Sequence, residues 1–152
     1  PEEVRRREMR LGDTVVVYDE GGNWRGAGTA WYLAEAGKSV ILVTPDAFVG
    51  KELERTSADA PLRRRLACAG VQVFCEHGIA RWHGNRVTLH NFLTRTEHSL
   101  PASALVMATT NQSFDIFKEV FDKKTTYRIG DAAAPRQAPY AFYEGRQLGM
   151  SL

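Results

Sequence analysis

The segment VVVYDEGGNWRGAGTAWYLAEAGKSVILVTP, residues 15–45, carries the clearest indication of fold class in this 152-residue chain. Val15 to Tyr18 form an apolar run rich in β-branched residues, which is typical of a parallel strand buried on both faces. A helical pattern with small residues at its start follows, and Gly37 is a favourable residue for its C-terminus. Residues 39–44 then indicate a second buried strand. Strand, helix and strand within about 30 residues predict a right-handed βαβ unit.

The same alternation continues beyond Pro45. A second helix is expected over 61–69, and residues 71–75 alternate as a third strand. From His77 the pattern changes to short strands broken by polar turns, which predicts a β-meander that returns to a core strand over 104–108. Together these elements predict an α/β protein: a Rossmann-like, three-layer FAD/NAD(P)-binding fold with a parallel sheet and a β-meander.

The last part of the chain predicts three further elements. Residues 114–124 form a short amphipathic pattern whose phenylalanines suit a core-facing helix. A strand is expected to end at Ile129, with Gly130 and Asp131 at its tip. A final helix can begin near Pro139, because proline is well tolerated in a first helical turn.

Composition and charge exclude several classes of protein. The net charge of +2 is small and the basic residues alternate with acidic ones, so no nucleic-acid partner is expected. No apolar run approaches the roughly 20 residues of a membrane helix, and the N-terminus PEEVRRREMR lacks the apolar part of a signal peptide. We therefore expect a cytoplasmic protein without a membrane partner. Cys68 and Cys75 lack zinc-ligand spacing, so no metal site is expected, and we expect reduced, buried thiols.

The loop after the first strand has the architecture of a dinucleotide site but not its chemistry. The fingerprint GxGxxG lets backbone N–H groups approach the pyrophosphate. The best register here is Gly21, Asn23 and Gly26, so a side chain replaces the second glycine. Asp19 and Glu20 add two carboxylates near the expected phosphate, each costing about 1 kcal/mol or more in repulsion.

The end of the second strand is also unusual for a dinucleotide site. It reads Val43-Thr44-Pro45, without the acidic residue that binds the ribose or an arginine for a 2′-phosphate. Two hypotheses follow. The loop is a scaffold without its ligand, with Asp19 and Glu20 capping the helix; or it is an active NAD(P)H site, with Arg25 offsetting the carboxylates and the phosphates cradled by Gly21, Gly22 and Gly26.

Two segments carry a family resemblance: residues 15–45, and YRIGDAAAPRQAPYAFYEGRQLG at 127–149. Together they resemble the C-terminal portion of trimethylamine dehydrogenase and its relatives, which include dimethylamine and histamine dehydrogenases, old-yellow-enzyme-like demethylases and 2,4-dienoyl-CoA reductase. The similarity extends from about Leu11 to Gly149. It implies a NAD(P)-binding-like Rossmann domain over residues 1–111 and, over 112–152, the returning segment of an FAD/ADP-binding-like domain.

The resemblance also implies a function for a larger parent protein. Its N-terminal TIM barrel is expected to hold FMN and an iron–sulfur cluster and to perform the chemistry on a small amine, as an amine dehydrogenase or N-demethylase. The present chain then contains no catalytic residue, and Asp131 is the expected contact for ADP or FAD. An electron-transfer flavoprotein is the expected electron acceptor, and the parent is expected to be a homo-oligomer.

Departures from the family pattern favour the dehydrogenase branch. The sequence ATTNQ at 108–112 stands where many relatives have Ala-Thr-Gly followed by arginine, and the glycine loop is degenerate. The dehydrogenases do not need NAD, so a degenerate loop suits them. The alternatives are an NADH:flavin oxidoreductase similar to dienoyl-CoA reductase, in which this chain binds NAD(P)H, and a stand-alone adaptor without a redox role.

Overall fold

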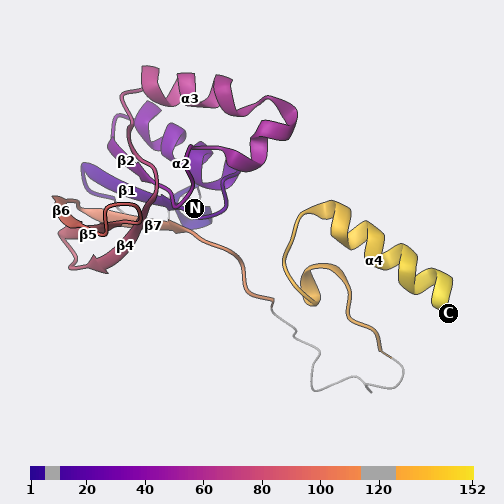
Figure 1. The fold of residues 1–152 in the computed structure, drawn as a ribbon. Helices are drawn as coiled ribbons and strands as arrows, with labels where there is room; N and C mark the ends of the chain where they lie inside the picture. The colour runs from indigo at the N-terminus through magenta and orange to yellow at the C-terminus, as the bar shows by residue number, and fades with distance from the viewer. Residues whose placement is uncertain (6–10, 114–125) are drawn as a thin grey trace. The chain divides into compact units, whose positions relative to one another are not determined.

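The computed structural model describes residues 1–5, 11–113 and 126–152, shown in Figure 1. The chain divides into two compact units, Pro1–Thr109 and Thr110–Leu152.

The first unit contains a four-stranded parallel sheet with the strand order β3-β2-β1-β7. Its members are β1 (Thr14–Asp19), β2 (Ser39–Val43), β3 (Gln72–Phe74) and β7 (Ala104–Ala108). Val16 of β1 pairs with Ile41 of β2 on one side and with Leu105 of β7 on the other. Because the chain passes from β1 to β2 and β3 and only later returns to β7, the topological switch point lies between β1 and β7.

Helices cover one face of this sheet. They are α2 (Trp24–Glu35) and α3 (Asp59–Cys68), and the short helices α1 (Glu2–Arg5) and η1 (Lys51–Thr56) complete the unit. The predicted end of α2 is confirmed. Gly37 has φ +81°, a left-handed conformation that favours glycine, and its N–H donates to the Ala34 carbonyl at 3.0 Å. Gly70 has φ +72° in the same place after α3.

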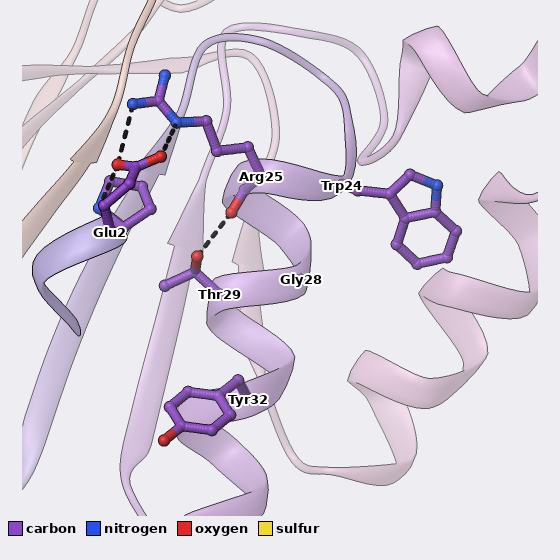
Figure 2. A pocket seen from close by; sticks show the side chains of 7 residues that line it. Glu2, Trp24, Arg25, Gly28, Thr29 and Tyr32 are labelled. Carbon is purple, nitrogen blue, oxygen red and sulfur yellow. Dashed lines mark hydrogen bonds and ion pairs between the residues drawn. The ribbon is translucent and has the colours of Figure 1, made fainter. Parts of the chain in front are cut away.

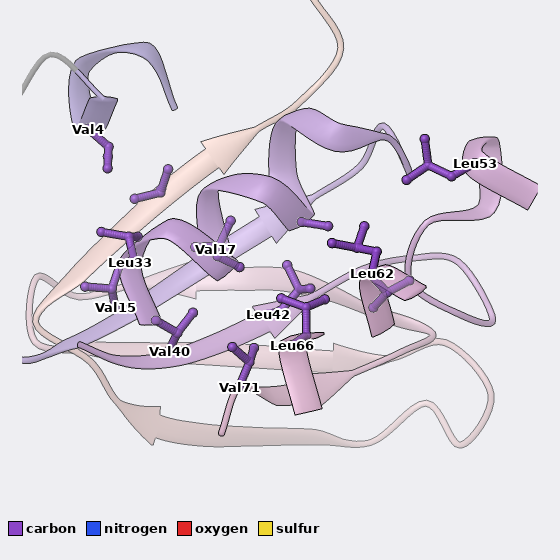
Figure 3. Close-up of a cluster of buried hydrophobic side chains, with 14 residues drawn as sticks. Val4, Val15, Val17, Leu33, Val40, Leu42, Leu53, Leu62, Leu66 and Val71 are labelled. Carbon is purple, nitrogen blue, oxygen red and sulfur yellow. The ribbon is translucent and has the colours of Figure 1, made fainter. Parts of the chain in front are cut away.

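An antiparallel sheet covers the opposite face (Figure 1). Its strands are β4 (His77–Trp82), β5 (Arg86–Asn91) and β6 (Glu97–Pro101), paired in that order. Because side chains alternate along a strand, each central strand contributes to two cores. Val15, Val17 and Leu42 pack on the helical side (Figure 3), whereas Val16 and Val43 pack against the meander. The three-layer α/β fold is confirmed.

The second unit contains η2 (Gly130–Ala132) and α4 (Ala138–Ser151). The helix near Pro139 is confirmed. The strand expected to end at Ile129 is wrong, because residues 126–129 have no partner strand among the described residues and a strand needs one to satisfy its backbone. The amphipathic pattern at 114–124 lies outside the described residues.

The surface of α3 carries arginines that lie over aromatic rings. Arg63 lies over the Phe48 ring at 5.1 Å and Arg65 over the Trp31 ring at 4.7 Å, so two of its arginines pack on aromatic residues. Cys68 is exposed and Cys75 half-buried, both as free thiols. The expectation of two buried cysteines is therefore wrong for Cys68, which is exposed at the last position of α3.

Candidate nucleotide site at the carboxyl end of the sheet

The glycine loop connects the end of β1 to the start of α2, next to the switch point of the sheet. Asn23 is the N-cap of α2, and its Oδ1 accepts the N–H of Arg25 at 2.8 Å. The expectation that Asp19 and Glu20 cap the helix is thus wrong, because the N-cap residue is Asn23. Asp19 is the last residue of β1 and lies one loop earlier.

The Asp19 side chain is enclosed by this loop. It is 1% exposed, and its Oδ1 accepts the Gly22 N–H at 3.2 Å. Its Oδ2 is buried and has no hydrogen-bond partner within the described part of the chain. Burial raises the pKa of this carboxyl from 3.8 to about 6, although the backbone N–H groups of Gly22, Gly21 and Ala27 oppose that rise. A carboxylate therefore lies where the fingerprint loop brings its N–H groups together.

Gly26 makes room for that carboxylate. A Cβ built on Gly26 would lie 2.3 Å from Asp19 Cγ and 2.4 Å from Oδ1, distances that no side chain tolerates. In a dinucleotide site the third glycine allows the helix to pack closely against the strand. Here the absent side chain of Gly26 accommodates Asp19.

The segment after β2 closes the other side of the loop. Gly22 has φ +59°, and its carbonyl accepts the Glu52 N–H at 2.9 Å. A Cβ on Gly22 would lie 2.9 Å from Asp46 Oδ2, and Asp46 is ion-paired with Lys51 at 3.0 Å. Asp46 was not among the predicted site residues, because it follows Val43-Thr44-Pro45, the strand end at which an acidic residue is expected. The chain's own residues thus occupy the space beside Gly22.

Arg25 joins α2 to the N-terminal helix. Its Nε donates to Glu2 Oε1 at 3.1 Å and its guanidinium also donates to the Thr109 carbonyl at 3.1 Å. The hydrogen bond from Arg25 lowers the pKa of Glu2 to about 2. Both residues line a cavity of about 320 Å³ next to α2, whose other lining residues include Trp24, Gly28 and Tyr32. Figure 2 shows these side chains along the helix. The cavity lies along the helix, and its lining does not include Gly21 or Gly22.

The structure brings three of the four predicted site residues together. Gly21, Gly22 and Gly26 surround the Asp19 carboxylate, whereas Asp131 belongs to the second unit. Asp131 is exposed in η2, and its Oδ1 accepts the Arg136 N–H at 3.3 Å.

The turn around Asp131 is fixed to α4 through Glu144. Gly130 has φ +60° and its N–H donates to Glu144 Oε2 at 2.7 Å, and Arg136 contacts the same carboxylate. These two contacts lower the pKa of Glu144. The turn that carries Asp131 therefore has a defined conformation relative to the helix.

The described residues include no group of three or more His, Cys, Asp or Glu side chains placed to hold a metal ion. None of their helices is long and apolar enough to cross a membrane.

The comparisons with known proteins point to one group of enzymes. No protein-family model matches the sequence, and no curated protein does. Among solved structures, histamine dehydrogenase from Rhizobium sp. 4-9 matches 100% of this chain at 27% identity with a TM-score of 0.88, over 25% of its own length. The 6-hydroxypseudooxynicotine amine oxidase from Pseudomonas geniculata N1 matches 99% at 27% identity and a TM-score of 0.87, over 24% of its length. A 2-naphthoyl-CoA reductase shares the fold, at 23% identity and a TM-score of 0.78 over 99% of this chain and 23% of its own.

The fold and the loop define a nucleotide-binding-like domain of the kind found in flavoprotein oxidoreductases. The recognition made from the sequence is confirmed: these neighbours are members of the trimethylamine dehydrogenase and 2,4-dienoyl-CoA reductase family, and this chain matches their C-terminal domain. The chain spans only about a quarter of the length of these neighbours.

Proposed function

We propose that this chain is the C-terminal part of a larger FMN- and iron–sulfur-dependent oxidoreductase that acts on the C–N bond of a small amine, and that its own role is structural. The observation that carries the proposal is the similarity over the whole chain. Two amine-oxidising enzymes match 99–100% of these residues at 27% identity, over only 24–25% of their own length. The catalytic groups then lie in the remainder of the parent protein.

We propose that the parent protein has an N-terminal TIM barrel that holds the FMN and the iron–sulfur cluster. The barrel is the direct partner of this chain, an electron-transfer flavoprotein accepts the electrons, and the enzyme is a cytoplasmic homo-oligomer. These features rest on the family resemblance. Light scattering on the full-length protein tests the oligomer, and reoxidation of the reduced enzyme by purified electron-transfer flavoprotein tests the acceptor.

The geometry of the glycine loop supports the structural role. Asp19 fills the space opened by Gly26, and Asp46 fills the space beside Gly22. A dinucleotide does not fit these residues, because its phosphates would meet buried or ion-paired carboxylates. This counts against the alternative in which the chain is an active NAD(P)H-binding module.

Asp131 is the residue through which we propose that the second unit contacts an ADP-like group in the full-length protein. Its exposed carboxylate lies on a turn fixed to α4 by Glu144, a position from which it can accept hydrogen bonds from ribose hydroxyls. Asp131→Ala in the full-length protein is expected to lower the amount of ADP or FAD released on denaturation. Asp59→Ala, in the first unit, serves as the control and is expected to leave that amount unchanged.

The experiment that tests the proposal uses the full-length protein. Flavin, nucleotide, iron and sulfide are quantified after denaturation, and flavin bleaching is followed without oxygen on addition of small N-methylated amines, NADH or NADPH. We expect FMN, an iron–sulfur cluster and faster bleaching by an amine. A protein without flavin, or one reduced faster by NADH or NADPH than by any amine, would overturn the proposal.

A further inference from the structure

The fold and the chemistry of the glycine loop disagree. In dinucleotide-binding domains the N–H groups of this loop and of the first helical turn bind the pyrophosphate. In this chain the corresponding N–H groups already have an anion, because Gly22 donates to Asp19 Oδ1 at 3.2 Å. The N–H groups of Gly21 and Ala27 also favour the ionised carboxylate, and they offset part of the rise in pKa that burial causes.

We propose that the Asp19 carboxylate is an internal anion that takes the place of a bound phosphate, and that Asp19 is the residue that excludes a dinucleotide from this loop. The inference rests on the proposed function, in which the domain is structural, and adds the residue and the interaction that make it so.

The steric evidence concerns Gly26. The gap that its missing side chain leaves between β1 and α2 is filled by the carboxylate, since a Cβ there would lie within 2.5 Å of three Asp19 atoms. The side chain is 1% exposed, so it is enclosed between β1 and α2. In the folded domain Asp19 therefore fills this gap.

The electrostatic evidence concerns the charge that Asp19 brings. Two negative charges about 4 Å apart at a partly buried site repel strongly enough to weaken phosphate binding about a thousandfold. Asp46 lies on the far side of Gly22, but Lys51 offsets its charge at 3.0 Å. Among the described residues no basic side chain forms an ion pair with Asp19, and its hydrogen bond comes from the backbone of the loop itself.

The orphaned Oδ2 supports this interpretation. A carboxylate placed only for stability is expected to have both oxygens satisfied, because a buried acceptor without a donor destabilises the folded state. Asp19 has one oxygen bonded to the loop and one without a hydrogen-bond partner among the described residues. The unsatisfied oxygen is therefore a cost of placing the carboxylate here, and stability alone does not account for it.

The test measures hydrogen exchange of the 20–30 segment in the full-length protein, by mass spectrometry. Asp19→Ala removes the internal anion, and exchange in this segment is expected to become about tenfold faster, as for the loss of one hydrogen bond. Millimolar inorganic phosphate is then expected to restore much of the protection, because it can enter the vacated space. Potassium chloride at the same ionic strength is expected not to do so.

Two variants and the unsubstituted protein serve as controls. The unsubstituted protein and Asp19→Asn are expected to show no response to phosphate, because a side chain still fills the gap beside Gly26. Asp59→Ala removes a carboxylate from the first turn of α3 and is expected to leave the 20–30 segment unchanged. If Asp19→Ala gives no folded protein, Asp19→Ser replaces it with the same expected response.

The outcomes separate this inference from the proposed function. Equal exchange with and without phosphate in the alanine or serine variant overturns the role of Asp19 as an internal anion, and leaves the structural role of the domain intact. Protection of the unsubstituted protein by NADH overturns both. Failure of both variants to fold even when refolded with phosphate also counts against the inference, because phosphate is expected to replace the missing anion.

Discussion

At the scale of single residues, Asp19 and Gly26 form a matched pair between β1 and α2. The carboxylate is tolerated in the interior because one residue of the facing helix has no side chain and because backbone N–H groups point toward it. Each residue limits what can stand at the other position. The pair also makes the stability of the domain depend on pH.

The first prediction concerns that pH dependence. The folded-state pKa of Asp19 is about 6, against 3.8 in the unfolded chain, so the folded state holds the proton more tightly. The stabilisation from this group is therefore complete below about pH 4 and is lost as the pH rises through 6, by about 3 kcal/mol. Urea unfolding of the protein and of Asp19→Asn across this range measures it. Parallel pH profiles for the two proteins would contradict the prediction.

The second prediction compares two glycines of the same helix. Gly26→Ala is expected to destabilise the fold by about 2 kcal/mol or more, because the new Cβ overlaps Asp19. Gly28→Ala has open space and is expected to stabilise the helix by about 0.5–1 kcal/mol. Thermal unfolding measures both, and combining Gly26→Ala with Asp19→Ala is expected to recover most of the loss. Equal effects of the two alanines would count against the packing described here.

At the scale of elements, α2 places the loop through its two ends. Asn23 caps its N-terminus and Gly37 ends it in the left-handed conformation. Both ends are fixed by local chemistry, whereas the orientation of the helix on the sheet comes from Ala27, Ala30 and Leu33, which are buried against β1 and β2. The small side chains allow the close approach that encloses Asp19.

The third prediction concerns the cap. Asn23→Ala removes the acceptor for the Arg25 N–H at 2.8 Å and is expected to cost about 1 kcal/mol, whereas Asn23→Ser keeps an acceptor and is expected to cost much less. Thermal unfolding followed by circular dichroism distinguishes them. If the serine and alanine variants unfold at the same temperature, the Asn23 side chain is not the stabilising cap.

At the scale of the whole chain, the two units differ in how much they bury. The first has two cores, one on each face of the parallel sheet. In the second, no residue of the 14-residue α4 is buried, and Phe142 is 78% exposed. A helix of this length without a packed face is marginal in water.

The fourth prediction follows from that difference. A protein of residues 1–109 is expected to unfold cooperatively on heating, whereas a peptide of residues 126–152 is expected to show little helical signal in water. Circular dichroism of each measures this. A strongly helical peptide would show that α4 needs no further packing partner.

The sequence was a good guide to the fold wherever the signal is local. The apolar runs of β1 and β2, the glycine after α2 and the proline at the start of α4 each act through their own neighbours. The prediction of a strand before Gly130 failed because strand pairing is not local: residues 126–129 have the composition of a strand but do not pair with another strand in the described part of the chain. The prediction that both cysteines are buried failed for a similar reason, because the exposure of Cys68 depends on which face of α3 packs on the rest of the domain.

The candidate site was predictable only in part. That the glycine loop is degenerate follows from the sequence, because it depends only on the identity and spacing of Asp19, Gly21 and Gly26. The position of the carboxylate follows only from the packing of the fold. Whether it points to solvent or into the loop depends on the packing distance between β1 and α2, and the closure by Asp46 depends on a segment that returns from the end of β2. Both are contacts between separate elements, which a one-dimensional pattern does not encode.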